Sequence, residues 1–77
     1  MSVTRAEVAA RAHARDLACL SALLDAETLK GAAFALGVSK HTVDRRLGAL
    51  RERAGGATTL MVVYQFADEL HRYREGR

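Results

Sequence analysis

Apolar residues recur along the chain at intervals of three and four, which is the spacing of one face of an α-helix. This pattern predicts four helices, at about residues 4–24, 26–36, 40–54 and 58–74. Apart from one ambiguous stretch at the start of the fourth helix, no segment combines alternating polarity with the β-branched residues of a strand. The chain also contains no proline, which would interrupt such helices. The sequence therefore predicts an all-α fold in a single domain over residues 1–77.

Capping residues stand at the ends of the predicted helices. Thr4 precedes the first helix with Glu7 three residues later, which is the arrangement of a capping box. Ser39 precedes the third helix, as an N-cap should. Gly37 follows the second helix, where a residue free to adopt positive φ is favoured. These residues place a short, sharp turn between the second and third helices.

The residues around this turn have the spacing of a helix-turn-helix. Ala33 is small enough for a crossing helix to approach, and Gly37 makes the turn four residues later. Val38 is expected to pack beneath the turn, and Val43 to anchor the next helix onto the second. Two short helices that cross at about 90–120° through a three-residue turn need this combination. The sequence therefore predicts a helix-turn-helix, with its recognition helix at about residues 40–54.

The predicted recognition helix divides into a core face and an outward face, because each residue advances by about 100°. Outward residues near the start of such a helix read base edges, while flanking residues bind phosphates. Arg45 is suited to bidentate pairing with guanine, and Asp44 to accepting a hydrogen bond from the amino group of cytosine. The expected base contacts are His41, Asp44 and Arg45. The expected phosphate contacts are Lys30, Ser39, Lys40, Thr42, Arg46 and Arg53.

The distribution of charge adds to this interpretation. The chain has a net charge of +3, and residues 38–53 account for all of it, with five basic and two acidic residues. The segments before and after this stretch are each balanced. A local basic excess on a small domain is typical of nucleic-acid binding. The alternative is that the basic run is only the solvated face of a helix.

The segment LKGAAFALGVSKHTVDRRLGALRERAGGATTLMVV resembles the DNA-binding domain of LuxR/GerE-type bacterial regulators, over roughly residues 17–70. Similarity to LysR-type N-terminal domains and to region 4 of sigma factors is confined to residues 32–53. The LuxR/GerE resemblance implies a four-helix domain whose third helix enters the major groove and whose fourth forms a dimer interface. It departs at Asp44, where the family usually has a basic residue. The matching residues are Lys30, Ala33, Leu36, Gly37, Val38, Ser39, Thr42, Val43, Leu47 and Gly55.

The predicted fourth helix has two apolar stripes, and a chain of 77 residues has little left to cover the second. An uncovered apolar stripe often marks a partner surface. We therefore expect a homodimer, whose symmetry would match a palindromic DNA site. The alternative is that the first helix folds back over this stripe within one monomer. The expected dimer interface consists of Val62, Phe66 and Tyr73.

Several function classes are not indicated by the sequence. The three histidines and Cys19 lack the spacing of a metal site, and no catalytic carboxylate pair or phosphate-binding loop is recognisable. Cys19 is expected to be a buried small apolar residue. We expect a protein without a metal, cofactor or enzymatic activity. A single cysteine, and the lack of a signal pattern or a membrane-spanning apolar run, favour a cytoplasmic protein with no membrane contact.

These observations favour a small DNA-binding regulator of transcription, from a bacterium or phage, that acts as a dimer on double-stranded DNA. Two alternatives remain open at this point. In the first alternative, the helix-turn-helix is only a scaffold, and the fourth helix binds a host regulator or a subunit of the transcription machinery. In the second, the protein is an architectural factor in recombination that bends DNA with little sequence preference.

Overall fold

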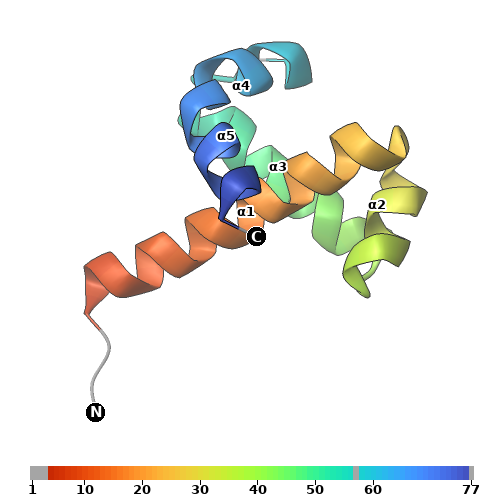
Figure 1. Ribbon diagram of the computed structural model, residues 1–77, viewed down its shortest axis with the longest axis horizontal. Helices are drawn as coiled ribbons and strands as arrows, with labels where there is room; N and C mark the ends of the chain where they lie inside the picture. The colour runs from red at the N-terminus through yellow and green to blue at the C-terminus, as the bar shows by residue number, and fades with distance from the viewer. Residues whose placement is uncertain (1–3, 57, 77) are drawn as a thin grey trace.

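The computed structural model describes residues 4–56 and 58–76, and the regular secondary structure within them is entirely helical (Figure 1). The predicted all-α fold is confirmed. The third helix lies close to its predicted bounds, whereas the second starts later and the fourth is divided in two. The helices are α1 (Arg5–Ala26), α2 (Leu29–Leu36), α3 (Lys40–Arg53), α4 (Thr59–Gln65) and α5 (Ala67–Glu75).

The long helix α1 is the element against which most of the others pack. It contacts α2, α3 and α5, while α4 packs on α3 and α5. Its 22 residues correspond to about 33 Å at 1.5 Å per residue, close to the 38 Å length of the whole molecule. Only the second half of α1 lies within the body. The first half, residues 5–12, is exposed on all sides and projects beyond the other helices (Figure 1).

The corner between α1 and α2 lies later than the apolar pattern predicts. Helix α1 continues to Ala26 and ends at Glu27, which adopts the left-handed conformation with φ +67°. Thr28 then caps α2 by accepting a hydrogen bond from the backbone N–H of Gly31 at 3.0 Å. Apolar spacing alone could not locate this corner, because Ala26 and Leu29 fit the same periodic pattern. The tight corner brings Gly31 directly against the end of α1.

We expect Gly31→Ala to destabilise the protein by about 1 kcal/mol, against the usual helix preference. Alanine in place of a helical glycine normally stabilises by about 1 kcal/mol. Here a Cβ would lie 2.9 Å from the Cβ of Ala26 and 3.0 Å from the hydroxyl of Thr28, and such overpacking costs about 1–3 kcal/mol. Gly48→Ala is the matched control, because its Cβ would meet only the far end of Arg51 at 3.7 Å.

Chemical denaturation of both glycine variants tests this prediction. Gly48→Ala should raise the free energy of unfolding and Gly31→Ala should lower it. Equal stabilisation by the two substitutions would show that the corner has room for a methyl group.

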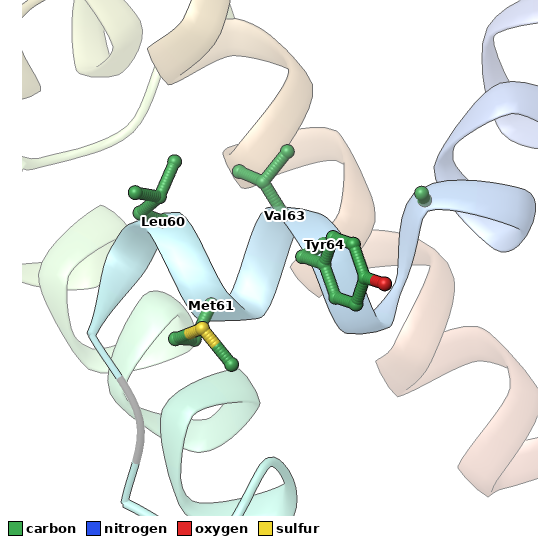
Figure 2. Close-up of a pocket in the computed structure, with 5 residues that line it drawn as sticks. Leu60, Met61, Val63 and Tyr64 are labelled. Carbon is green, nitrogen blue, oxygen red and sulfur yellow. The ribbon is translucent and has the colours of Figure 1, made fainter.

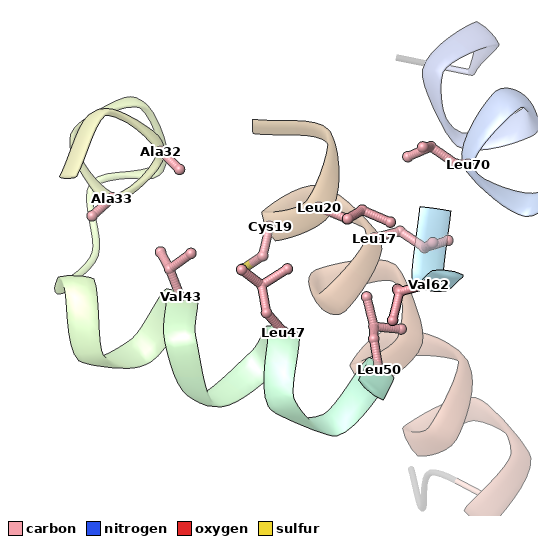
Figure 3. Close-up of a cluster of buried hydrophobic side chains, with 10 residues drawn as sticks. All are labelled: Leu17, Cys19, Leu20, Ala32, Ala33, Val43, Leu47, Leu50, Val62 and Leu70. Carbon is pink, nitrogen blue, oxygen red and sulfur yellow. The ribbon is translucent and has the colours of Figure 1, made fainter. Parts of the chain in front are cut away.

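One core joins all five helices (Figure 3). Its centre is formed by Leu20 of α1 and Leu50 of α3, both with no exposed surface. In Figure 3, Val43 points toward α2, while Leu47 and Leu50 point toward the side chains of α1. Aliphatic packing therefore holds the fold together, as the scarcity of aromatic residues requires. The buried apolar residues are Leu17, Cys19, Leu20, Ala32, Ala33, Val43, Leu47, Leu50, Val62 and Leu70.

The predicted fourth helix is broken at Phe66. Thr58 caps α4 by accepting a hydrogen bond from the N–H of Met61 at 3.4 Å, but Phe66 departs from helical geometry with φ −102° and ψ 17°. Its N–H still bonds to Val62, and its carbonyl still accepts from Leu70. The break is therefore a kink, and it allows Val62 and Leu70 both to reach the core although they would lie about 80° apart on a straight helix.

Candidate nucleic-acid interface

The turn between α2 and α3 is fixed by backbone and hydroxyl contacts. Gly37 has φ +68°, and the N–H of Val38 donates to the carbonyl of Ala33 at 3.1 Å, which closes α2 with a Schellman-type pattern. Ser39 then caps α3 by accepting from the N–H of Thr42 at 3.1 Å. Val38 packs against the core. The predicted role of each of these residues in the turn is confirmed.

The three predicted base-contact residues lie on the outside of α3. His41, Asp44 and Arg45 are all exposed. Ala49 and Gly48, on the same side, have small or no side chains, so the surface around Arg45 is low. This part of α3 can therefore approach a flat or grooved partner closely. The exposed charges themselves are mixed, since Asp44 lies directly beside Arg45.

The predicted phosphate contacts divide into two groups. Ser39 and Lys40 are exposed at the turn and the start of α3, Lys30 is exposed in the first turn of α2, and Thr42 is half-buried. The hydroxyls of Ser39 and Thr42 lie 2.9 Å apart and share a hydrogen bond. The other two residues, Arg46 and Arg53, lie on the flank of α3 that packs against α1 and have partners there.

Arg46 lies beside Cys19, which is fully buried, as the sequence predicts for this residue. Burial raises the pKa of the Cys19 thiol above its ordinary value, because the thiolate is poorly solvated there. The Arg46 guanidinium opposes that rise through a hydrogen bond and through its charge. The net shift is upward, so the thiol stays protonated at neutral pH and is a poor nucleophile.

Arg53 belongs to a chain of polar contacts that links three helices. One Nη atom binds the buried carboxylate of Asp16, and the other donates to Nδ1 of His13 at 2.6 Å. Nε2 of His13 contacts the carboxylate of Glu69 on α5. Because a guanidinium has only donors, Nδ1 of His13 must accept and Nε2 must carry the ring proton. The arrangement therefore fixes the neutral tautomer of His13.

A second polar link joins the C-terminal end of α5 to α1. Arg74 donates from Nε to the hydroxyl of Ser21 at 3.1 Å and pairs through Nη2 with Asp25. Ser21 is buried, with 1 % of its surface exposed. None of these contacts was predictable from the sequence, because the partners lie about 50 residues apart. Together with the His13 chain, they fix the position of α5 along α1.

The predicted dimer interface faces inward. Val62 is 1 % exposed and belongs to the core, and Phe66 and Tyr73 pack against it. The ring of Phe66 also lies against that of His13 on α1, with 5.7 Å between centroids. The expectation that these three residues form a free stripe is therefore wrong. The core takes up all three residues within the monomer, and α1 covers Phe66 as in the alternative that the sequence left open.

The exposed apolar surface lies on the other side of the kinked segment. Leu60 and Tyr64 are each 78 % exposed. They lie at a shallow apolar hollow of about 470 Å³ that is lined by Leu60, Met61, Val63, Tyr64 and Ala67. Figure 2 shows Leu60 and Val63 projecting from one side of α4 and Met61 from the other. We call these five residues the α4 groove.

Other chemistry is not evident in the described part of the chain. Residues 4–56 and 58–76 contain no group of three or more His, Cys, Asp or Glu side chains placed to hold a metal ion. None of the helices described has the length and apolar character needed to cross a lipid bilayer.

Comparison with known proteins gives no further assignment. No protein-family model matches the chain, and no curated protein or solved structure is significantly similar to it.

Proposed function

We propose that this protein binds double-stranded DNA through a helix-turn-helix formed by α2 and α3, and that it regulates transcription in a bacterium or phage. The proposal is carried by the turn at residues 37–39, which joins two packed helices and leaves the N-terminal half of α3 exposed. Helices joined in this way place the second helix in the major groove. The resemblance of residues 17–70 to LuxR/GerE-type domains supports the same function.

The base contacts in this proposal come from His41, Asp44 and Arg45. All three are exposed near the start of α3, the part of a recognition helix that reads base edges. Phosphate contacts come from Ser39, Lys40 and Thr42 at the turn and the start of α3, and from Lys30 at the start of α2. Arg46 and Arg53 are excluded from this set, because their side chains are engaged with α1.

We expect Arg45→Ala to remove sequence preference while much of the non-specific affinity remains. A bidentate contact to guanine discriminates by about 1–3 kcal/mol, whereas phosphate contacts carry no direct sequence information. The measurement is fluorescence anisotropy, first with mixed-sequence duplexes across a salt series and then with duplexes enriched by selection. Glu52→Ala is the control, because Glu52 is exposed about two turns further along α3.

Each outcome of this titration has a distinct meaning. Wild-type binding that weakens steeply with salt supports contacts to several phosphates. Unchanged selectivity in Arg45→Ala would contradict the assignment of the reading face. The absence of binding at low salt would overturn the DNA-binding proposal and favour a protein partner in the transcription machinery.

We further propose that the protein is a homodimer that associates through the α4 groove. The groove is the apolar hollow described above, and α4 packs on the core side of α3. A second copy on α4 therefore leaves the outward face of both α3 helices free for DNA. An isologous contact of this kind gives the two-fold symmetry of a palindromic site.

We expect Leu60→Asp to shift the protein to a monomer, because a charge in the centre of an apolar interface remains unpaired. Phe34→Asp is the matched control, since Phe34 is 90 % exposed on α2, away from the groove. Sedimentation velocity over a range of concentrations measures the change. A wild-type protein that is monomeric at all concentrations would contradict the dimer. So would an equal effect of the two substitutions.

A further inference from the structure

Arg11 and Arg15, two of the exposed arginines of α1, have no ion-pair partner among the described residues. They lie one helical turn apart, and neither takes part in a side-chain hydrogen bond within residues 4–56 and 58–76. By contrast, Arg46 and Arg53 of α3 are engaged with α1. The free positive charge on this side of the molecule is therefore carried by α1 as well as by α3.

Contacts of neighbouring residues fix the direction in which these arginines point. Asp16 binds Arg53, and Cys19 lies beside Arg46, so this side of α1 faces α3. His13 binds Glu69, so the other side faces α5. At about 100° per residue, Arg15 lies about 40° beyond Cys19 and about 160° from His13. Arg11 lies about 40° further in the same direction. Both arginines therefore point away from α5, along the flank next to α3.

The same reasoning shows which surface of α3 continues into this flank. On α3, Arg46 and Arg53 face α1. Going around the helix from these two residues and away from the core, the next side chains are Thr42, Ala49 and Arg45. On α1, the corresponding exposed side chains are Arg15 and Arg11. The outward face of α3 and the arginine flank of α1 thus form one continuous surface. Arg11 belongs to the exposed N-terminal part of α1, which projects beyond the other helices (Figure 1).

We propose that Arg11 and Arg15 bind phosphates of the same duplex whose major groove receives α3. This inference rests on the proposed DNA-binding function and extends the contact surface to α1. The backbone positions of the two arginines are about 6 Å apart along the helix axis, since four residues rise about 1.5 Å each. The two side chains can therefore reach neighbouring phosphates of one strand. Arginine binds phosphate oxygens through paired N–H donors, and both side chains are exposed.

The test is the salt dependence of duplex binding by the double variant Arg11→Ala/Arg15→Ala. Each phosphate contact contributes about −0.9 to the slope of log K against log salt, so the double variant should have a slope shallower by about 2. Its sequence preference should be unchanged, because phosphate contacts do not read bases. Alanine is the strongest helix former, and circular dichroism should confirm that α1 remains folded.

Arg72→Ala is the matched control for loss of charge. Arg72 is exposed on α5, on the opposite side of α1 from Arg15. It should leave the slope unchanged, whereas Arg15→Ala alone should reduce it by about 0.9. If Arg72→Ala has the same effect as Arg15→Ala, the arginines act only through overall charge and the inference is overturned.

The inference can fail separately from the proposed function. If the double variant binds with the wild-type slope while Arg45→Ala still loses sequence preference, the protein binds DNA without α1 and the inference is overturned. If the wild-type protein binds no duplex even at low salt, both proposals are overturned together.

Discussion

Leu50→Ala is expected to lower the free energy of unfolding by about 2–5 kcal/mol, the range found for a buried leucine truncated to alanine. Leu50 has no exposed surface and lies where α3 meets both α1 and α4 (Figure 3). A domain of 77 residues has a total stability of only about 4–12 kcal/mol at the usual 0.05–0.15 kcal/mol per residue. The loss is therefore a large fraction of the total, and a substantial unfolded population is expected at 37 °C.

Urea denaturation followed by circular dichroism measures this effect. Leu60→Ala is the control, because the same side-chain truncation is made at a residue that is 78 % exposed. It should change stability by less than about 0.5 kcal/mol. Equal destabilisation by the two variants would contradict the core described here, because it would mean that Leu60 is also covered in solution.

The second large effect is expected from Arg53→Ala, which should destabilise the protein by about 2–3 kcal/mol. Removal of one partner of a fully buried ion pair costs about 3–5 kcal/mol, because the remaining charge stays buried without a partner. The carboxylate of Asp16 is in this position, with 8 % of its side chain exposed, whereas the side chain of Arg53 is 41 % exposed. Water can therefore reach the site and reduces the cost.

The double variant Asp16→Ala/Arg53→Ala provides the control for this prediction. It should be more stable than Arg53→Ala alone, because no charge is left buried. Together with Asp16→Ala, the three variants form a double-mutant cycle that measures the coupling between the two side chains. Duplex binding by the same variants separates the two roles of Arg53. If Arg53→Ala keeps wild-type stability but loses affinity for DNA, Arg53 is a phosphate contact, as the sequence alone predicts.

Features that depend on neighbours in the chain could be predicted from the sequence. Each of the caps Thr4, Ser39 and Thr58 accepts a hydrogen bond from the backbone N–H three residues later. The positive φ of Gly37 follows from its place in the turn. The buried face of α3 also follows from its spacing. Each of these features is settled within one or two helical turns, so local sequence contains the necessary information.

Features that depend on distant segments could not be predicted. Asp16 and Arg53 are 37 residues apart, and nothing in their local sequences pairs them. The spacing of about 100° per residue divides the predicted fourth helix into two apolar stripes. It gives no reason to choose which stripe meets the core. It also assumes one straight helix, and Phe66 is not a residue that ordinarily breaks one. The kink arises from packing. Because of it, Val62 lies in the core and not in the predicted dimer interface.

The N-terminal part of α1 is exposed, whereas its C-terminal part is packed against other helices, so its two ends have different local stabilities. The backbone near Leu20 is released only when the whole core opens, whereas residues 5–12 are held by helix propagation alone. Their alanine-rich sequence favours the helix by a small margin per residue. A ligand that binds residues 5–12 therefore lowers the conformational entropy of this N-terminal arm. Affinity gained through the arm is reduced by the cost of ordering it, so helix-stabilising changes far from any contact would strengthen binding.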